Sequence, residues 1–527
     1  MDANENSPGE TRETRTIVFG RAPIRIEDVV ALARGDAEAA LDGDPGYRAK
    51  LKHSQQLLQE LFEAGRDPIY GMSTGVGSSI GNAIPAELAG NLGLNLFRLH
   101  GVGTGRILDD EEAAAVVSAR LPGLALGHSG VGAELLERLC LLLNERLLPR
   151  IPAEGSVGAS GDLTPLSYVA AALAGEREVS FRSRSMPAAE AWREIRVDPL
   201  QLSARDTLAI MNGTSAMTGL ACLAFDRAER LASLSAMVTA MVSDAIRGNP
   251  EHFSTRIFEL KPHPGSIQAA AWIRDHLASG PDRAPARLQD RYSIRCAPHV
   301  IGVLLDTLET TRETLEIELN SANDNPLLDL ENGTVLHGGN FHGAHVCAVM
   351  DSLKVAVASV ADLLDRQLAL LCVPETNGDL PENLVSGNGP ESLVHHGFKA
   401  MQIAASALAA EALKLTLPAA AFSRSTESHN QDKVSMGTIA ARDCLRILEL
   451  SESVAAIGLL AAAQAVDLRG ADASSSSSVA VRDAVRERVP MLDADRRQDV
   501  DIKQVLELHR EGLLPCPSRS NGETAVT

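Results

Sequence analysis

Small apolar residues repeat at helical spacing in four long stretches beyond residue 213. The stretches are residues 214–247, 344–373, 398–417 and 437–468, and the first of them contains one glycine, Gly219, and no proline. Each is much longer than the usual globular helix of about 11–12 residues. Long helices rich in alanine and leucine pack closely through small side chains. The pattern therefore predicts a mainly α protein built around a long-helix bundle.

The part of the chain before residue 213 has a different pattern, in which glycine and proline interrupt short helical segments. We expect an N-terminal domain at residues 18–213, the bundle at 214–470, and a linker, C-terminal helices and a tail at 471–527. Residues 1–17 are polar and charged, lack the apolar segment of a secretory signal, and are predicted to be a disordered tail. The serine run 474–478 is predicted to belong to the linker.

Composition narrows the range of partners and compartments. The 527 residues carry a formal charge of -20 and a pI near 5.2, which disfavours nucleic acid and anionic membranes as partners. No uninterrupted apolar run reaches the length of a membrane-spanning helix. Seven cysteines, without a CxxC pair, are typical of reduced thiols in a cytoplasmic protein.

The stretch "EGSVGASGDLTPLS" at residues 154–167 carries the most distinctive candidate chemistry. If the backbone nitrogen of Gly161 attacks the carbonyl carbon of Ala159, loss of water closes a five-membered ring, since Gly161 has no Cβ to obstruct the bend. Loss of the Ser160 hydroxyl then leaves a methylidene group conjugated to that ring. The alternative is an ordinary glycine-rich turn before a helix. We assign that ordinary role to the second Ala-Ser-Gly, at residues 278–280.

A longer motif, "GSVGASGDLTPLSYVAAALAGE", and further motifs in order between Val18 and Arg469 resemble the aromatic amino-acid ammonia-lyases and aminomutases. The resemblance implies the ammonia-lyase/fumarase-like fold, with an N-terminal domain that carries the prosthetic group. It also implies that Ala159-Ser160-Gly161 forms 4-methylidene-imidazol-5-one (MIO) autocatalytically, without a metal. Members of the family are homotetramers whose sites are built from several subunits, and their partner is a small aromatic amino acid.

The resemblance also assigns roles to individual residues. Tyr70, in "IYGMSTGVG", is the expected base, with its pKa lowered from about 10 by burial near positive charge or hydrogen-bond donors. Asn212 is expected beside the prosthetic group, Arg295 at the substrate carboxylate, and Tyr292 as a second catalytic tyrosine. The other substrate-binding residues implied are Leu99, His100, Gln289, Asn325, Phe341, Lys399, Glu427, Asn430 and Gln431.

Two positions bear on which amino acid is recognised. Leu99 and His100 occupy the family's selectivity pair, and His100 can hydrogen-bond either a phenol or an imidazole. Histidine lyases typically have a glutamate where this chain has Gln431, which is neutral. We therefore expect conversion of L-tyrosine to trans-4-coumarate and ammonia, and possible use of phenylalanine to give cinnamate. Tyr70 takes the β-proton once the substrate amine, or its ring, has added to the methylidene. Histidine ammonia-lyase is the second interpretation.

Other functions remain open at this point. A tyrosine 2,3-aminomutase shares the same residues and differs in the fate of the product. Lyases of the fumarase and argininosuccinate type carry a "GSSxMPxKxN" loop, and "GSSIGNA" at residues 77–83 does not continue in that way. An inactive helical scaffold would leave Ser160 uncyclised. His337 and His342 lack companion ligands at zinc spacing, so no metal is predicted.

Overall fold

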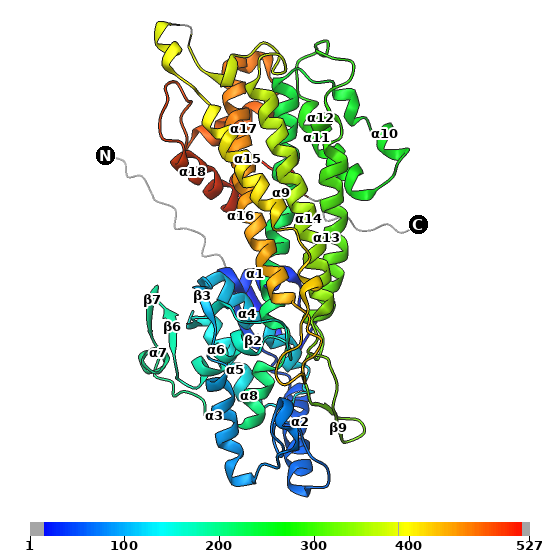
Figure 1. Cartoon of the computed structure of the whole chain (residues 1–527), viewed down its shortest axis with the longest axis vertical. Helices are drawn as coiled ribbons and strands as arrows, with labels where there is room; N and C mark the ends of the chain where they lie inside the picture. Colours follow the sequence, from blue (N-terminus) through cyan, green and yellow to red (C-terminus); the bar gives the residue numbers. More distant parts are fainter. Residues whose placement is uncertain (1–14, 388, 519–527) are drawn as a thin grey trace, which may run out of the picture. The chain divides into compact units, whose positions relative to one another are not determined.

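The computed structural model is mainly helical and describes residues 15–387 and 389–518 (Figure 1). It divides into two compact units, each assembled from three segments of the chain. Unit 1 comprises Met1–Leu223, Leu315–Val346 and Phe422–Ile439. Unit 2 comprises Ala224–Thr314, Cys347–Ala421 and Ala440–Thr527. The boundaries expected at residues 213 and 470 follow the order of the chain, whereas each observed unit is discontinuous in sequence.

Unit 1 consists of short helices and small sheets. Its helices are α1 (Ile26–Arg34), α2 (Pro45–Ala64), α3 (Ala89–Leu99), α4 (Asp110–Ala125), α5 (Ala133–Asn144), α6 (Leu163–Leu173), α7 (Ala188–Glu194) and α8 (Ala204–Met211). Its strands are β1 (Arg15–Phe19), β2 (Ala37–Leu41), β3 (Thr104–Ile107), β4 (Leu148–Pro149), β5 (Pro152–Glu154), β6 (Glu178–Phe181), β7 (Arg184–Pro187), β8 (Leu327–Asp329) and β9 (Thr334–Leu336). The parallel pair β1–β2 places residues 15–17, predicted as part of a disordered tail, in a strand. Residues 1–14 lie outside the described residues.

The remaining sheets of unit 1 are antiparallel and small. They are β3–β5, β4–β6–β7 and β8–β9. Short 3₁₀ segments at Gly77–Gly81 and Ala86–Leu88 connect α2 to α3. Strand pairs this short cannot make a stable layer alone, so they depend on the buried helices around them, of which α4 is almost wholly buried.

The long helices confirm the bundle predicted from the sequence. They are α9 (Ser215–Ala245), α13 (Ala297–Leu319), α14 (Ala344–Cys372), α15 (Lys399–Lys414) and α16 (Gly437–Arg469). Four of them match the four predicted stretches, with ends that differ by at most three residues. Helix α13 was not among those stretches.

Within unit 2, polar contacts tie α9 to three of its neighbours. Arg227 on α9 binds Glu452 on α16 at 2.8 Å, and Thr239 accepts from Gln367 on α14 at 2.9 Å. The guanidinium of Arg312 on α13 lies 4.6 Å from the ring centroid of Phe225. Shorter elements complete the unit: α10 (Thr255–Glu259), α11 (Pro264–Leu277), α12 (Tyr292–Arg295), α17 (Ser476–Arg486), α18 (Asp499–Arg510), and 3₁₀ segments at Pro250–Phe253, Glu382–Leu384, Pro390–Val394, Ala419–Phe422 and Ala471–Ala473.

The serine run 474–478 is not a plain linker, contrary to the prediction. Ser475 caps α17, since its side chain accepts from the backbone N–H of Ser478 at 3.1 Å, and its own N–H donates to Asp244 at 2.7 Å.

None of the helices in residues 15–387 and 389–518 combines the length and apolar character needed to cross a bilayer. All seven cysteines lie within these described residues, and all are free thiols.

Candidate functional site

A pocket of about 560 Å³ in unit 1 collects half of the residues predicted to form the site. Its volume lies within the range of about 300–1,000 Å³ typical of small-molecule sites. The predicted residues that line it are Tyr70, Ala159, Ser160, Asn212, Asn325, Phe341, Asn430 and Gln431. Other lining residues, which the sequence did not single out as binding groups, are Gly77, Ile80, Gly158, His337, Gly338, Gly339, His342, Asp432, Lys433 and Val434.

The Ala-Ser-Gly segment makes a very tight turn at the wall of this pocket. Ser160 and Gly161 both have left-handed backbones, with φ of 51° and 74°. A Cβ on Gly161 would lie 2.2 Å from the carbonyl oxygen of Gly213, so only glycine can make this close approach. The N–H of Asp162 donates to that same oxygen at 2.8 Å. The turn therefore packs directly against Gly213, the residue that follows Asn212.

Asp162 stabilises the Ala-Ser-Gly turn through the hydrogen bonds of its buried carboxylate and does not cap α6. Its side chain makes no capping bond, although Asp162 is the residue that precedes the helix. The carboxylate instead accepts from the hydroxyl groups of Ser156, at 3.0 Å, and Thr438, and from the N–H of Met217 at 2.8 Å. Burial raises the pKa of this carboxyl, and the same hydrogen bonds oppose the rise.

Two amide side chains hold the two oxygen atoms of Ser160. The Nδ2 of Asn212 donates to the Ser160 carbonyl oxygen at 3.2 Å, and the Nε2 of Gln431 donates to its hydroxyl at 3.2 Å. Asn212 is 2% exposed, and its Oδ1 has no hydrogen-bond partner among the described residues. An unpaired buried acceptor of this kind is costly and is common at functional sites.

Tyr70 faces the pocket with its phenol held by a backbone donor. The N–H of Gly77 donates to the Tyr70 hydroxyl at 2.8 Å. Burial nevertheless raises the pKa of Tyr70, and the charge of Glu427 raises it further, while the Gly77 hydrogen bond lowers it. The expectation of a lowered pKa is therefore wrong for this chain by itself, because the loss of solvation outweighs the single donor.

Glu427 joins the tyrosine loop to the loop that carries Asn430 and Gln431. Its carboxylate accepts from the N–H of Ser78 at 3.0 Å and from the Ser78 hydroxyl at 2.6 Å. These bonds lower the pKa of Glu427. Three consecutive residues, Glu427, Ser428 and His429, have positive φ of 44°, 55° and 60°. Non-glycine residues in this region are strained, which is frequent in ligand-binding loops.

Of the remaining predicted residues of unit 1, some line the pocket and others lie outside its lining. The Oδ1 of Asn325 accepts from the N–H of Gly338 at 2.8 Å. This hydrogen bond stabilises the loop that contains Phe341, which also lines the pocket. Leu99 and His100, at the end of α3, are not part of the described lining, and Leu99 is 66% exposed. Burial lowers the pKa of His100, so its imidazole is neutral at neutral pH.

Four predicted residues belong to unit 2 and do not line the pocket described above. The Nε of Arg295 donates to the carbonyl oxygen of Asp290 at 3.0 Å, and its guanidinium lies 4.7 Å from the Tyr292 ring centroid. Tyr292 is 72% exposed, and Gln289 and Lys399 are also exposed. The other guanidinium donors of an arginine placed in this way can still bind a carboxylate.

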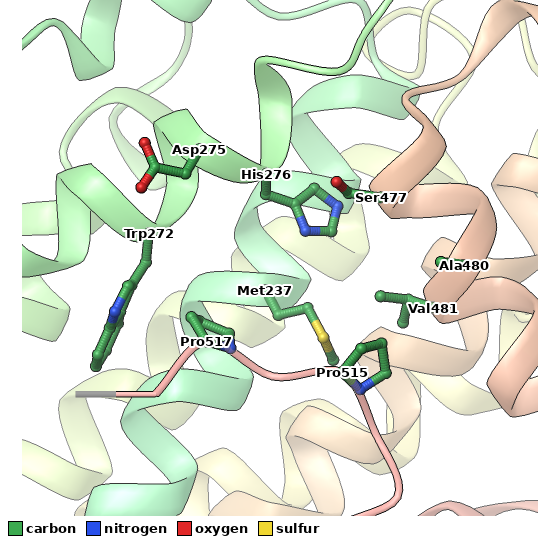
Figure 2. A pocket seen from close by; sticks show the side chains of 9 residues that line it. All are labelled: Met237, Trp272, Asp275, His276, Ser477, Ala480, Val481, Pro515 and Pro517. Atoms are coloured by element: carbon green, nitrogen blue, oxygen red, sulfur yellow. The ribbon is translucent and has the colours of Figure 1, made fainter. Parts of the chain in front are cut away.

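Unit 2 has a cavity of its own, of about 340 Å³ (Figure 2). Its lining residues are Met237, Trp272, Asp275, His276, Ser477, Ala480, Val481, Pro515 and Pro517. His276 bonds the Ser478 hydroxyl at 3.1 Å, and burial lowers its pKa to about 4. No residue predicted for the site lies there. Ser279, in the second Ala-Ser-Gly, follows the end of α11 and bonds Ser477 at 3.1 Å.

Some residues that organise the unit 1 pocket were missed. Gly77 and Ser78 belong to the loop motif "GSSIGNA", but nothing in the sequence around them indicates their contact with Glu427. Arg120 had a signal, because it is a charged residue within the apolar run "AAAVVSARLPGLAL". Among the described residues, no group of three or more His, Cys, Asp or Glu side chains could hold a metal ion.

Comparisons with known proteins give a consistent result. The family model described as aromatic amino acid lyase matches residues 24–487. The histidine ammonia-lyase of Gloeobacter violaceus is 36% identical over 95% of this chain and 97% of its own. The tyrosine ammonia-lyase of Cupriavidus metallidurans is 37% identical over 93% and 95%.

A third relative is an aminomutase. The MIO-dependent tyrosine 2,3-aminomutase of Streptomyces globisporus is 39% identical over 90% of this chain and 92% of its own. A crystal structure of tyrosine aminomutase from that organism aligns with a TM-score of 0.88 at 36% identity, covering 94% of this chain and 97% of the other. The ammonia-lyase/fumarase-like fold class expected from the sequence is confirmed.

Proposed function

The chain belongs to the aromatic amino acid lyase family, and on that premise we propose that it is an ammonia-lyase that converts L-tyrosine to trans-4-coumarate and ammonia. Phenylalanine is proposed as a second substrate, giving cinnamate. A cytoplasmic location is part of the proposal and is supported by the free thiols.

The observation that carries the proposal is the pair of amides on Ser160. We propose that Ala159-Ser160-Gly161 forms MIO, which supplies an electrophilic methylidene when present. The residues fit that group. Two successive left-handed residues fold the turn tightly, and Gly161 has no Cβ. Gln431 donates to the hydroxyl that must leave, and Asn212 donates to the carbonyl oxygen that the ring retains.

Tyr70 is proposed to take the β-proton of the substrate. Burial raises the pKa of Tyr70 in the chain alone, and a positive charge close to the phenol would lower it. The ammonium group of an amino-acid substrate carries such a charge, and an opposite charge nearby favours the phenolate. Substrate binding would thus help to activate the base, and the N–H of Gly77 would stabilise the phenolate oxygen.

The choice of tyrosine rests on two side chains. Gln431 is neutral and already donates to Ser160, so the pocket lacks the glutamate that histidine lyases typically place there. His100 lies outside the described lining of the pocket; we propose that its neutral imidazole reaches the phenol of a bound substrate, and such a hydrogen bond would favour tyrosine over phenylalanine. Histidine ammonia-lyase is the alternative, and relatives of both kinds have similar identity.

A homotetramer is proposed to complete the site. Gln289, Tyr292, Arg295 and Lys399 would reach the pocket from neighbouring copies, with Arg295 at the substrate carboxylate. The exposure of Gln289, Tyr292 and Lys399 in the single chain supports this arrangement, whereas Arg295 is half-buried. Neighbouring apolar residues at the surface also support it: Leu288 is 86% exposed and Leu393 is 85% exposed.

The test is to incubate the purified protein separately with L-tyrosine, L-phenylalanine and L-histidine and to follow the absorbance of the unsaturated acids. Coumarate from tyrosine at the highest kcat/KM supports the proposal, and dominant urocanate from histidine overturns the substrate. The second candidate is a tyrosine 2,3-aminomutase, favoured by the structural likeness to such an enzyme. Chromatography of the tyrosine reaction separates the two, because an aminomutase accumulates β-tyrosine.

A further inference from the structure

Buried charged side chains form a cluster close to the Ala-Ser-Gly turn: Arg120, Arg205 and Asp324. Arg120, on α4, is 1% exposed and is among the largest fully buried side chains. A buried guanidinium is strongly destabilising unless its donors are satisfied. Its Nε donates to the carbonyl oxygen of Ala209 at 3.0 Å, Nη2 donates to that of Asn212 at 3.2 Å, and Nη1 donates to the Oδ1 of Asn323 at 2.6 Å.

These contacts fix the end of helix α8. The last carbonyl groups of a helix have no partner within it and carry partial negative charge. Arg120 satisfies two carbonyl groups there, those of Ala209 and Asn212, and Asn212 is the C-cap residue that directly follows α8. The side chain of Asn212 then donates to the Ser160 carbonyl oxygen. Two hydrogen bonds thus connect the guanidinium to the proposed reacting segment.

A second connection runs through packing. A Cβ on Gly213 would lie 2.1 Å from the Nη1 of Arg120, and a Cβ on Gly161 would lie 2.2 Å from the Gly213 oxygen. Arg120, Gly213 and Gly161 are therefore stacked without space for even one additional carbon. Protein interiors packed in this way transmit a displacement rather than absorb it.

The cluster contains a second buried guanidinium group, that of Arg205. Arg205, 3% exposed, pairs with Asp324 and donates to the carbonyl oxygen of Ser129 at 2.6 Å. Burial lowers the pKa of Arg120 to about 10, so the group remains protonated at neutral pH. Burial raises the pKa of Asp324, which the two guanidinium groups oppose. Two buried guanidinium groups, those of Arg120 and Arg205, thus act on the carboxyl group of Asp324.

We propose that Arg120 is a positioning residue for the reaction: it holds the end of α8 so that Asn212 and Gly213 fix Ser160 and Gly161 in the geometry needed for ring closure and for elimination. The inference rests on the proposed function. Arg205 is a matched control, because it is equally buried in the same cluster but contacts neither Asn212 nor Gly213 among its hydrogen bonds.

The experiment compares R120K and R205K in the full-length chain. Each variant is measured for stability in denaturant, for the fraction of chains that lack two waters by mass, and for kcat and KM with tyrosine. R120K should lower kcat by about 10- to 100-fold with KM changed less than about threefold, because a small misplacement of reacting groups has such an effect. The dehydrated fraction should fall by about twofold or more. R205K at similar stability should change kcat by less than about threefold.

The inference is overturned if R120K and R205K lower kcat and the dehydrated fraction equally at matched stability. Should R120K not fold, N323S frees the Nη1 of Arg120 without altering the arginine, and an unchanged kcat in N323S would overturn the inference. Failure of the proposed function is a separate result. In that case the wild-type chain itself would release ammonia from none of the three amino acids.

Discussion

The side-chain amide of Asn212 donates to the carbonyl oxygen of Ser160 across 3.2 Å, although the two residues are 52 positions apart in the chain. The contact joins the end of α8 to the Ala-Ser-Gly turn. It places a buried donor at the oxygen that would gain negative charge if Ser160 became part of an electrophilic ring, and such a donor in a water-excluded site stabilises developing charge strongly.

Replacing Asn212 with alanine should lower kcat for tyrosine by about 100- to 1,000-fold, because the donor to the Ser160 oxygen is lost. Steady-state kinetics on the purified variant measures this effect, with circular dichroism as a check on the fold. Asn332→Ala is the matched control, since Asn332 is exposed and bonds Asp329 in the β8–β9 turn. Equal activity of N212A and N332A would contradict the role of Asn212.

Gly77 is needed both for its conformation and for its missing side chain. Its φ is 58°, and a Cβ would lie 2.7 Å from the Glu427 carboxylate. Gly77→Ala should lower the free energy of unfolding by about 1–3 kcal/mol and also reduce kcat, because the same residue donates to Tyr70. Gly81→Ala, in the same 3₁₀ segment, has open space around it and should change neither. Denaturant titration and kinetics of the two variants test this difference.

The charge of Glu427 should be visible in the pH dependence of the reaction. Glu427 raises the pKa of Tyr70, so Glu427→Gln should move the acidic limb of the kcat/KM profile to lower pH. The neutral amide can still accept from Ser78, which keeps the loop contact. Glu63→Gln, at an exposed position on α2, is the control. An acidic limb that stays in place, or moves to higher pH, would show that Tyr70 is not the base or does not sense Glu427.

Subunit mixing tests whether neighbouring copies complete the site. Tyr70→Phe and Arg295→Ala should each be nearly inactive as homotetramers. When the two are dissociated and reassembled together, some sites receive an intact Tyr70 from one copy and an intact Arg295 from another, so activity should return. A mixture of Y70F and N212A should recover none, because Tyr70 and Asn212 line the same pocket of one chain. No recovery in the first mixture would mean that Tyr70 and Arg295 act from the same copy.

The fold was predictable where local pattern decides the structure. Helices α9 and α16 are buried on almost all sides, and their small apolar residues, repeated at helical spacing without a proline, indicated both their length and their packing. Helix α13 was not predicted from the pattern. The serine run before α17 was misinterpreted, because low complexity hid an ordinary capping serine.

The site was predictable only in part, because its geometry depends on contacts that sequence spacing does not encode. Ser78 and Glu427 are 349 positions apart, and nothing local to either indicates the other. The expected sign of the Tyr70 pKa shift was wrong, because the fold buries the phenol and places the negative charge of Glu427 near it, and both effects raise the pKa. Arg120 was visible as a charge within an apolar run, but its partners at the end of α8 were not.

The most direct test of the account is the intact mass of the purified wild-type chain, followed by the mass of the peptide that contains residues 154–167. The account predicts a chain lighter than its sequence by two waters, with the deficit in that peptide, and a Ser160→Ala variant that cannot lose the second water and does not release ammonia. A wild-type peptide at the full mass of its sequence would contradict the account, because the proposed electrophile would then be absent.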